Sequence, residues 1–135
     1  MIIVVDTNVI ISGLIKPFSN ASKILNLIFS GKIKIAYDAR ILSEYIEILN
    51  RKKFNFNSRK VESIIALIKD EGIYINSTPL KESLPDMDDA PFLEVAVAGK
   101  INFLITGNKK HFPQHLYENT AVLSPAEFIK ECFLP

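Results

Sequence analysis

Short apolar runs alternate along this chain with longer segments in which apolar residues recur every three or four positions. The first run is Ile2–Val5, which is apolar throughout and mostly β-branched, as expected of a strand buried on both faces of a sheet. Residues 32–37 alternate between polar and apolar, and residues 73–75, 102–105 and 120–123 form further short apolar runs. We therefore predict five strands at these places.

Helical periodicity fills the segments between these runs. The predicted helices, with their boundary residues, cover residues 8–15, 19–31, 38–49, 58–72, 88–98 and a final segment from Ser124. We expect N-terminal caps at Asp38, Ser58 and Ser124. Glu127 follows Ser124 by three residues, which is the pattern of a reciprocal capping box.

The alternation of strands and helices predicts the fold class. It is typical of an α/β protein with a parallel or mostly parallel sheet and helices on both faces. We find no internal repeat or low-complexity linker, so we expect residues 1–135 to form a single domain. In such sheets ligands bind beyond the carboxyl ends of the strands, which directs attention to the residues that follow each strand.

The composition fits a globular protein and excludes some classes. Of the 135 residues, 48% are hydrophobic and 23% are charged, so the chain can bury a core without staples. The only cysteine, Cys132, cannot form an internal disulfide, and a reducing cytoplasm is the simplest expectation. No apolar run reaches the ~18 residues of a membrane span, and we expect no signal peptide and no membrane association. Because the net charge is +1, any nucleic-acid binding would need a local basic patch.

The first predicted strand ends on a carboxylate. Asp6 follows Val5 directly, and Thr7 and Asn8 come next. A group at the carboxyl end of a strand is well placed for function. All three side chains also suit the start of a helix, where they accept hydrogen bonds from free N–H groups. From the sequence alone, the two interpretations of Asp6 are about equally supported.

Glu44 lies at the boundary between the two faces of its predicted helix. Ile41 and Ile48, three residues before it and four after it, belong to the apolar face, whereas Glu47 belongs to the polar face. Glutamates are common at such boundaries, so position alone favours a solvated side chain over a functional one.

Three aspartates precede the apolar helix of residues 88–98. Asp86, Asp88 and Asp89 lie where the helix dipole favours negative charge, and Asp88 suits the cap position. Asp89 shares a face with Leu93 and Ala96, so we expect its side chain to be buried. A buried carboxylate needs a partner, and a cation is one candidate.

The segment after the strand of residues 102–105 repeats the opening pattern, because an apolar run again meets small polar residues. Thr106, Gly107 and Asn108 suit a tight turn, which is the common role of a Gly-Asn pair. The Asn108 amide can also bind a metal, a water molecule or the backbone. We expect the nearby His111 and His115 to be structural or solvent-facing rather than catalytic.

These polar clusters fall where an α/β fold would gather them, at one edge of its sheet. Carboxylate and amide oxygens suit Mg²⁺ or Mn²⁺, and clustered carboxylates repel one another without a cation. Such sites serve phosphoryl transfer and phosphodiester hydrolysis, in which the ion activates water and neutralises charge on the phosphate.

Four stretches, "VVDTNVIISGL", "ILSEYIEIL", "PDMDDAPFLEVAVAGKINFLITGNKKHF" and "VLSPAEFI", occur in an order and spacing that resemble those of the PIN-domain ribonuclease family. The resemblance covers essentially the whole chain and points to the small stand-alone prokaryotic branch, the toxin components of toxin–antitoxin pairs. It implies a three-layer α/β/α sandwich around a central parallel sheet. That fold agrees with the alternation described above.

The resemblance also implies roles for individual residues. Asp6, Glu44 and Asp89 match the family's acidic residues, which implies that they are catalytic and hold Mg²⁺ or Mn²⁺. Thr7 and Asn8 match the polar residues that shape the pocket.

The sequence departs from the family at Asn108, where many relatives carry a further aspartate. Asn108 adds no charge, and Asp86 or Asp88 are candidates to compensate, so the choice between one ion and two is left open. Lys109 and Lys110, beside this position, are candidates to contact RNA phosphates.

The function that follows is a metal-dependent endoribonuclease that hydrolyses RNA phosphodiester bonds, as the toxin component of a toxin–antitoxin pair. The resemblance further implies an antitoxin protein as a partner and a homodimer. The alternative is a catalytically weak or inactive PIN-like module that binds RNA or protein. Asn108 motivates that alternative.

Overall fold

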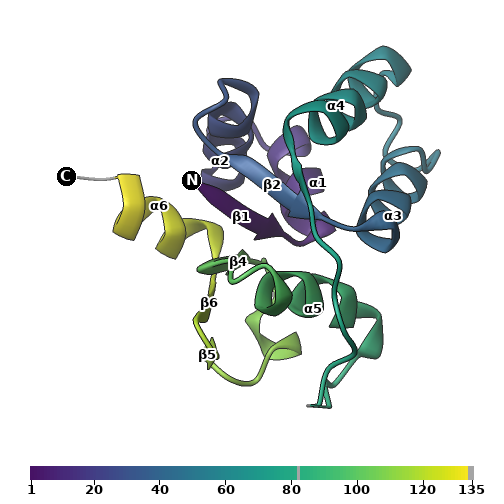
Figure 1. The fold of residues 1–135 in the computed structure, drawn as a ribbon. Helices are drawn as coiled ribbons and strands as arrows, with labels where there is room; N and C mark the ends of the chain where they lie inside the picture. Colours follow the sequence, from purple (N-terminus) through teal and green to yellow (C-terminus); the bar gives the residue numbers. More distant parts are fainter. Residues whose placement is uncertain (82, 134–135) are drawn as a thin grey trace.

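A computed structural model describes residues 1–81 and 83–133 of the chain (Figure 1). The strands are β1 (Ile2–Val5), β2 (Lys34–Tyr37), β3 (Ile73–Tyr74), β4 (Phe103–Ile105), β5 (Leu116–Tyr117) and β6 (Thr120–Leu123). Within the described residues they form one six-stranded sheet in the order β3-β2-β1-β4-β6-β5. Glu82, Leu134 and Pro135, which fall within the predicted single domain, lie outside the described residues.

The α/β class is confirmed, and of the two predicted forms of the sheet the structure has the mostly parallel one. The pairs β1–β2, β1–β4, β2–β3 and β4–β6 are parallel, as predicted. The final pair, β5–β6, is antiparallel, so the sheet is mostly parallel rather than parallel. The sequence pattern did not predict β5, because two residues are too few to show an alternation.

Helices flank the sheet, as expected of a layered sandwich. They are α1 (Thr7–Ile15), α2 (Asn20–Phe29), α3 (Ala39–Leu49), α4 (Ser58–Glu71), α5 (Ala90–Ala98) and α6 (Pro125–Phe133), with the short 3₁₀ helices η1 (Met87–Asp89) and η2 (Lys109–His111). α5 packs against β1, β2 and β4, and α1 packs against α2. In Figure 1, α5 lies below β1, and α1 and α2 lie above it. None of the described helices is long and apolar enough to cross a membrane.

The helix caps are partly as predicted. Asp38 accepts a hydrogen bond from the Ile41 N–H at 3.0 Å, which confirms it as the cap of α3. The prediction for α4 was wrong by one residue, because Asn57 makes the capping hydrogen bonds and Ser58 is the first helical residue. Asp88 is not a cap either, since Asp86 accepts the hydrogen bond from its N–H.

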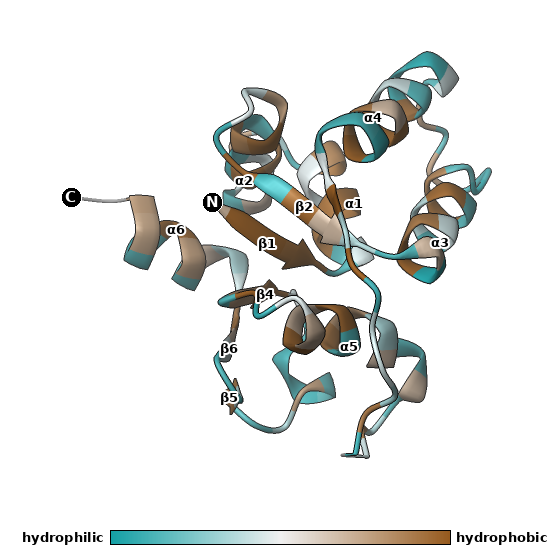
Figure 2. Cartoon of the chain, viewed as in Figure 1, coloured by the Kyte–Doolittle hydropathy of each residue, from teal (hydrophilic) through white to brown (hydrophobic). Residues whose placement is uncertain are grey.

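The core lies on both sides of β1, which is apolar along its length in Figure 2. Ile3, Val4 and Val5 are completely buried. Because β1 lies inside the sheet and beneath helices, it needs apolar side chains on both faces, which explains its unbroken apolar run. Because β1 lies inside the sheet, the polar residues that follow it lie near the middle of the sheet edge.

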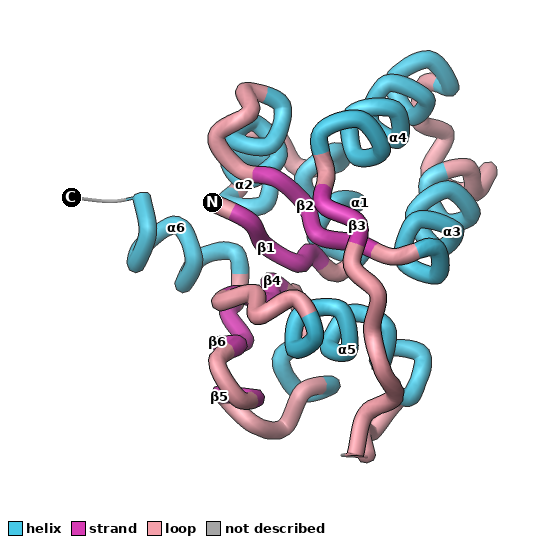
Figure 3. The backbone as a smooth tube through the Cα atoms, in the orientation of Figure 1, coloured by secondary structure: helices cyan, strands magenta, loops and turns pink. Residues whose placement is uncertain are grey.

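The parallel arrangement brings several strand ends to one edge of the sheet, where β1, β2 and β4 run side by side (Figure 3). The backbone N–H of Asp6 donates to the carbonyl of Ile105 at 2.9 Å, and that of Thr106 donates to Leu123 at 3.0 Å. Asp6 and Thr106 therefore leave their strands side by side. The candidate site is built at this edge.

Candidate active site

Asp6 points its carboxylate into the site and does not cap a helix. It occupies the N-cap position of α1, but its side chain makes no capping hydrogen bond. Its Oδ2 atom instead accepts hydrogen bonds from the Thr106 hydroxyl at 2.8 Å and the Asn8 amide at 3.3 Å. The residue is only 6% exposed. The strongest contacts of the side chain are therefore with Thr106 and Asn8 rather than with the free N–H groups of α1.

Glu44 reaches the same region from α3. Its Oε2 atom accepts a hydrogen bond from the hydroxyl of Thr7, the residue directly after Asp6. The next residue, Tyr45, is completely buried and donates its hydroxyl to the carbonyl of Val5. These two contacts fix α3 over the end of β1. Glu44 is therefore held beside Asp6 rather than solvated on an outer face.

Asp89 arrives from the turn before α5. Its side chain is 14% exposed, which agrees with the predicted burial, and its Oδ2 atom lies 2.9 Å from Nδ1 of His111. Apart from this ring nitrogen, the buried Oδ2 atom has no hydrogen-bond donor among the described residues. A buried, unsatisfied carboxylate oxygen is costly and is the kind of atom that a cation satisfies.

The three carboxylates disfavour one another's charge. Burial raises the pKa of Asp6, the hydrogen bond from Thr106 opposes this, and the charge of Asp89 adds to it. Burial also raises the pKa of Glu44, with a further contribution from the charge of Asp6. Burial raises the pKa of Asp89 as well; His111 lowers it and Glu44 adds to the increase. Among the described residues, no Lys or Arg side chain forms an ion pair with Asp6, Glu44 or Asp89.

The side-chain oxygens of the site are of the kind that binds a divalent cation, but their arrangement in the structure does not form a coordination shell. Carboxylate oxygens from Asp6, Glu44 and Asp89 are the hard donors that Mg²⁺ and Mn²⁺ prefer. Among the described residues, however, no three His, Cys, Asp or Glu side chains converge closely enough to hold an ion as they stand. The hydrogen bond of Glu44 to Thr7 would have to be exchanged for a metal contact. The effects of these carboxylates on one another's pKa show that they are near one another. To hold an ion together, their side chains would have to change conformation.

The other aspartates predicted as supporting residues lie at the rim. Asp86 and Asp88 are exposed, and their charges raise the pKa of Asp89 and Glu44 respectively. They contribute to the negative field of the site without being buried in it.

Asn8 and Asn108 tie the two strand ends together. Asn8 donates to Asp6 through its amide nitrogen and accepts from the Gly107 N–H through its oxygen, at 3.2 Å. A Cβ atom at position 107 would lie 3.3 Å from that oxygen, so glycine allows the close approach. The backbone N–H of Asn108 donates to the Thr106 hydroxyl at 3.0 Å.

The Asn108 amide contacts the ring of His111, at 2.9 Å between Nδ2 and Nε2. If the amide donates to Nε2, the proton of a neutral His111 lies on Nδ1, which faces Asp89. Asn108 thus supports a histidine that contacts an acidic residue.

The two lysines proposed for RNA contact differ in their surroundings. Lys109 pairs with Glu127 at 2.9 Å, so its charge is already partly compensated. Lys110 is exposed and makes no ion pair with the described residues. Of the two, Lys110 is the freer cation.

Sequence reasoning missed three contacts at the site. Thr106 was treated as a turn residue and His111 as structural or solvent-facing, and Tyr45 was not singled out. A signal for Thr106 was present, because it follows β4 exactly as Asp6 follows the adjacent β1. No local pattern marks Tyr45 or His111, whose contacts join residues 40 and 22 positions apart in the chain.

Comparisons with known proteins agree with this architecture. The chain is 34% identical over 140 residues to the uncharacterized protein MJ1680 of Methanocaldococcus jannaschii, a match that covers 96% of this chain and 90% of that protein. The solved structure of FitAB bound to an IR36 DNA fragment superposes with a TM-score of 0.58 at 20% identity, covering 93% of this chain and 95% of that one. That structural likeness supports the fold.

The family model of the PIN domain matches residues 2–110, which include β1 and the elements that carry Glu44, Asp89 and Asn108. The match spans most of the chain and includes all three of the acidic residues of the candidate site, while His111 lies just beyond it. This protein belongs to the PIN domain family.

Proposed function

We propose that this protein is a Mg²⁺- or Mn²⁺-dependent endoribonuclease. PIN domains are generally nucleases. The observation that carries the proposal is the placement of Asp6, Glu44 and Asp89 together at the carboxyl edge of the sheet, each with a raised pKa and one with a buried, unsatisfied oxygen. Perturbed carboxylates gathered at such an edge are typical of a functional site.

Asp6, Glu44 and Asp89 are the residues that would hold the ion. When bound, a divalent cation lowers the pKa of a water molecule and neutralises the charge that builds on the phosphate. The protein's own groups prepare the site: Thr106 and Asn8 orient Asp6, and Thr7 orients Glu44. Lys110 is exposed and free to contact an RNA phosphate.

The test is RNA cleavage with and without a divalent ion. We expect wild-type protein to cleave a mixed-sequence RNA in Mn²⁺ and to stop in EDTA, and Asp6→Asn, purified in parallel, to be inactive in both. Asp70→Asn, which removes an exposed aspartate on α4, is the matched control and should cleave like the wild type. Cleavage that survives EDTA, or that persists in Asp6→Asn, would refute the mechanism.

A second candidate is a binding module without efficient catalysis. Two observations favour it: Asn108 supplies no charge where many relatives have a carboxylate, and the described acidic side chains do not converge as they stand. Absence of Mn²⁺ binding to the wild-type protein at millimolar concentration, measured by calorimetry, would favour this module over the nuclease.

The proposed partners follow from the family. RNA is the proposed substrate, and an antitoxin protein and a second copy of this chain are the proposed protein partners. The structural neighbour is itself a complex, FitAB bound to DNA. Co-expression with the adjacent open reading frame followed by size-exclusion chromatography tests the antitoxin, and light scattering of the chain alone tests the homodimer.

A further inference from the structure

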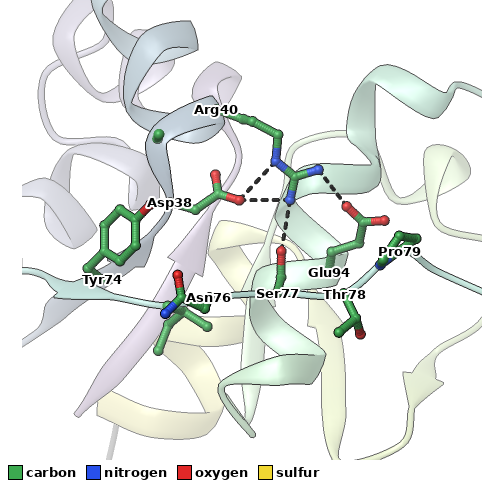
Figure 4. A pocket seen from close by; sticks show the side chains of 10 residues that line it. Asp38, Arg40, Tyr74, Asn76, Ser77, Thr78, Pro79 and Glu94 are labelled. Atoms are coloured by element: carbon green, nitrogen blue, oxygen red, sulfur yellow. Dashed lines mark hydrogen bonds and ion pairs between the residues drawn. The ribbon is translucent and has the colours of Figure 1, made fainter.

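A polar cavity of about 400 Å³ lies beside the active site, between the start of α3 and the middle of α5 (Figure 4). It is separate from the three carboxylates proposed to hold the metal. The guanidinium of Arg40 crosses it and points at Asp38 and Glu94, as Figure 4 shows. The proposed function gives these groups no role.

Arg40 joins three segments of the chain. Its Nε and Nη2 atoms donate to Oδ2 of Asp38 at 2.9 and 2.7 Å, and its Nη1 atom donates to Oε1 of Glu94 at 2.6 Å. Nη2 also donates to the Ser77 hydroxyl at 3.0 Å. Asp38 and Glu94 are both 7% exposed, and among the described residues Arg40 is the cation that pairs with each. We call the four side chains the Arg40 strap.

The second oxygen of Glu94 extends the strap to the loop after β3. Oε2 accepts the backbone N–H of Leu80 at 2.8 Å. In Figure 3 the loop after β3 runs alongside α5, and residues 78–81 share a second cavity with Glu94. Glu94 is therefore bonded to α3 on one side and to this loop on the other.

The strap connects the two helices that deliver acidic residues to the site. Arg40 and Glu44 lie four residues apart on α3, on the same face of the helix. Glu94 is on α5, whose first residue follows Asp89 directly. The charges of Glu44 and Asp89 oppose their approach, whereas those of Arg40 and Glu94 attract. The same two helices therefore carry one attractive charge pair, Arg40 and Glu94, and one repulsive pair, Glu44 and Asp89.

We propose that Arg40 and Glu94 are positioning residues for the acidic site, because their ion pair holds α3 and α5 at the spacing that brings Glu44 and Asp89 to Asp6. The proposal rests on the proposed function only in its reference to the metal. Tyr45 and Phe92 also pack between α3 and α5, with tilted rings 6.4 Å apart. This aromatic contact keeps the two helices together, and the strap sets the distance between them.

Mn²⁺ affinity separates this role from a simple effect of charge. Removing the positive charge of Arg40 makes the region more negative, so the electrostatic field alone predicts tighter Mn²⁺ binding by Arg40→Met. The strap predicts the opposite, a loss of about 10-fold, the lower end of what losing a direct partner of a metal ligand costs, because Arg40 acts on the ligands only through the helix spacing. Arg40→Lys keeps the positive charge but loses the planar guanidinium that bonds Asp38 and Glu94 at the same time. Its Mn²⁺ affinity should therefore lie between those of the wild type and Arg40→Met.

Arg51→Met is the matched control. Arg51 is also on α3 and pairs with Glu47 at 3.0 Å, but this pair stays within one helix and is exposed. We expect Arg51→Met to bind Mn²⁺ like the wild type. The measurement is the electron paramagnetic resonance signal of free Mn²⁺ in a titration, with far-UV circular dichroism to confirm folding. If Arg40→Met does not fold, Arg40→Lys and Glu94→Gln carry the test.

The outcomes are distinguishable. If the wild type binds Mn²⁺ and folded Arg40→Met binds it equally or more tightly, the strap is overturned and the proposed function stands. If the wild type binds no Mn²⁺, the proposed function fails. The strap is then tested by measuring the distance between α3 and α5.

That spacing is measured by double electron–electron resonance between spin labels at Ser43→Cys and Ala98→Cys, both exposed, in a Cys132→Ser background. We expect Arg40→Met to shift or broaden the distance distribution, and Arg51→Met to leave it unchanged. A distribution that Arg40→Met leaves unaltered would overturn the strap.

Discussion

The carboxylates at the sheet edge and the carboxylate at the start of α6 are chemically alike but have opposite pKa shifts. The pKa of Asp6, Glu44 and Asp89 is raised, with burial as the largest cause. The pKa of Glu127 is lowered to about 2, because the Ser124 N–H and the Lys109 ammonium donate to it.

The difference shows what each region is built to do. Glu127 and Ser124 exchange hydrogen bonds in the predicted capping box, and Lys109 adds a positive charge, so the carboxylate is satisfied by the protein itself. The three acids of the site have fewer donors than they need, and they repel one another. Glu127 is stabilised in its charged form by the protein itself, whereas burial and mutual repulsion disfavour the charged form of the other three.

The largest expected effect comes from removing one acid of the site. Asp89→Asn keeps the shape of the side chain but removes its charge, and RNA cleavage should fall by about 10²- to 10³-fold, the usual loss when a site loses one electrostatic contributor. Single-turnover cleavage in Mn²⁺ measures this. An Asp89→Asn protein that cleaves at the wild-type rate would break the comparison, because Asp89 would then be as dispensable to the chemistry as a capping residue.

The second effect concerns stability and Mn²⁺. A carboxyl group whose pKa is raised by folding contributes stability near and below its unfolded pKa, here 3.8 for Asp6 and 4.5 for Glu44, and that contribution is lost as the pH rises through the folded pKa. In EDTA, we therefore expect Asp6→Asn to be more stable than wild type at pH 7, by about 0.5–2 kcal/mol. The advantage should shrink toward pH 4.

Adding Mn²⁺ should reverse that order at pH 7. At 100 times its dissociation constant, the ion raises the free energy of unfolding of the wild type by about 2.7 kcal/mol. Asp6→Asn should gain far less. Urea denaturation at both pH values, with EDTA or Mn²⁺, measures all four conditions. A wild type that is more stable than the variant in EDTA at pH 7 would contradict the expected sign.

Restoring the missing acid sharpens the comparison. Asn108→Asp adds a charge beside His111 and Asp89, so Mn²⁺ binding should tighten by about fivefold, the equivalent of about 1 kcal/mol for one more nearby charge in a watery environment. Calorimetry gives both the affinity and the number of ions bound. Asn108→Ser serves as the neutral control, and equal affinities for the two variants would show that position 108 does not sense the ion.

The smallest effect is expected at the cap of α6. Glu127→Gln should lower the free energy of unfolding by about 0.5–1 kcal/mol at pH 7, because the residue is partly exposed and its ion pair is screened by water. Since folding lowers its pKa, this loss should vanish as the pH falls from about 4.5 to about 2. Mn²⁺ affinity should not change. A change in that affinity would show that the two regions are coupled through Lys109.

The sequence predicted most of the fold because most elements carry a local signal. β1 and β6 have the predicted bounds, and the capping residues Asp38 and Ser124 act as expected. The misses are local too. Asn57 and Ser58 are both good caps, so the sequence could not choose between them, and β5 is too short to form a pattern.

For the candidate site, the sequence named residues but not their contacts. Asp6, Glu44 and Asp89 were named from their positions and from the family resemblance; in the structure their charges influence one another's pKa, and their role in a metal site stays a prediction. Their partners were not foreseen: Thr106 was read only as a turn residue, although it follows β4 as Asp6 follows β1, and no local pattern marks His111. Lys109 looked equivalent to Lys110 in the sequence, and only the fold pairs it with Glu127.

The sequence by itself determined the alternation of elements, the central place of the buried β1 and the carboxylate that follows it, because hydrophobic periodicity and capping act over a few residues. Tertiary structure alone decided which polar and charged side chains contact one another. Asp6 finds Thr106 across 100 positions, and Arg40 finds Glu94 across 54. Burial and charge pairing depend on distances in space, which the chain sets only once it has folded.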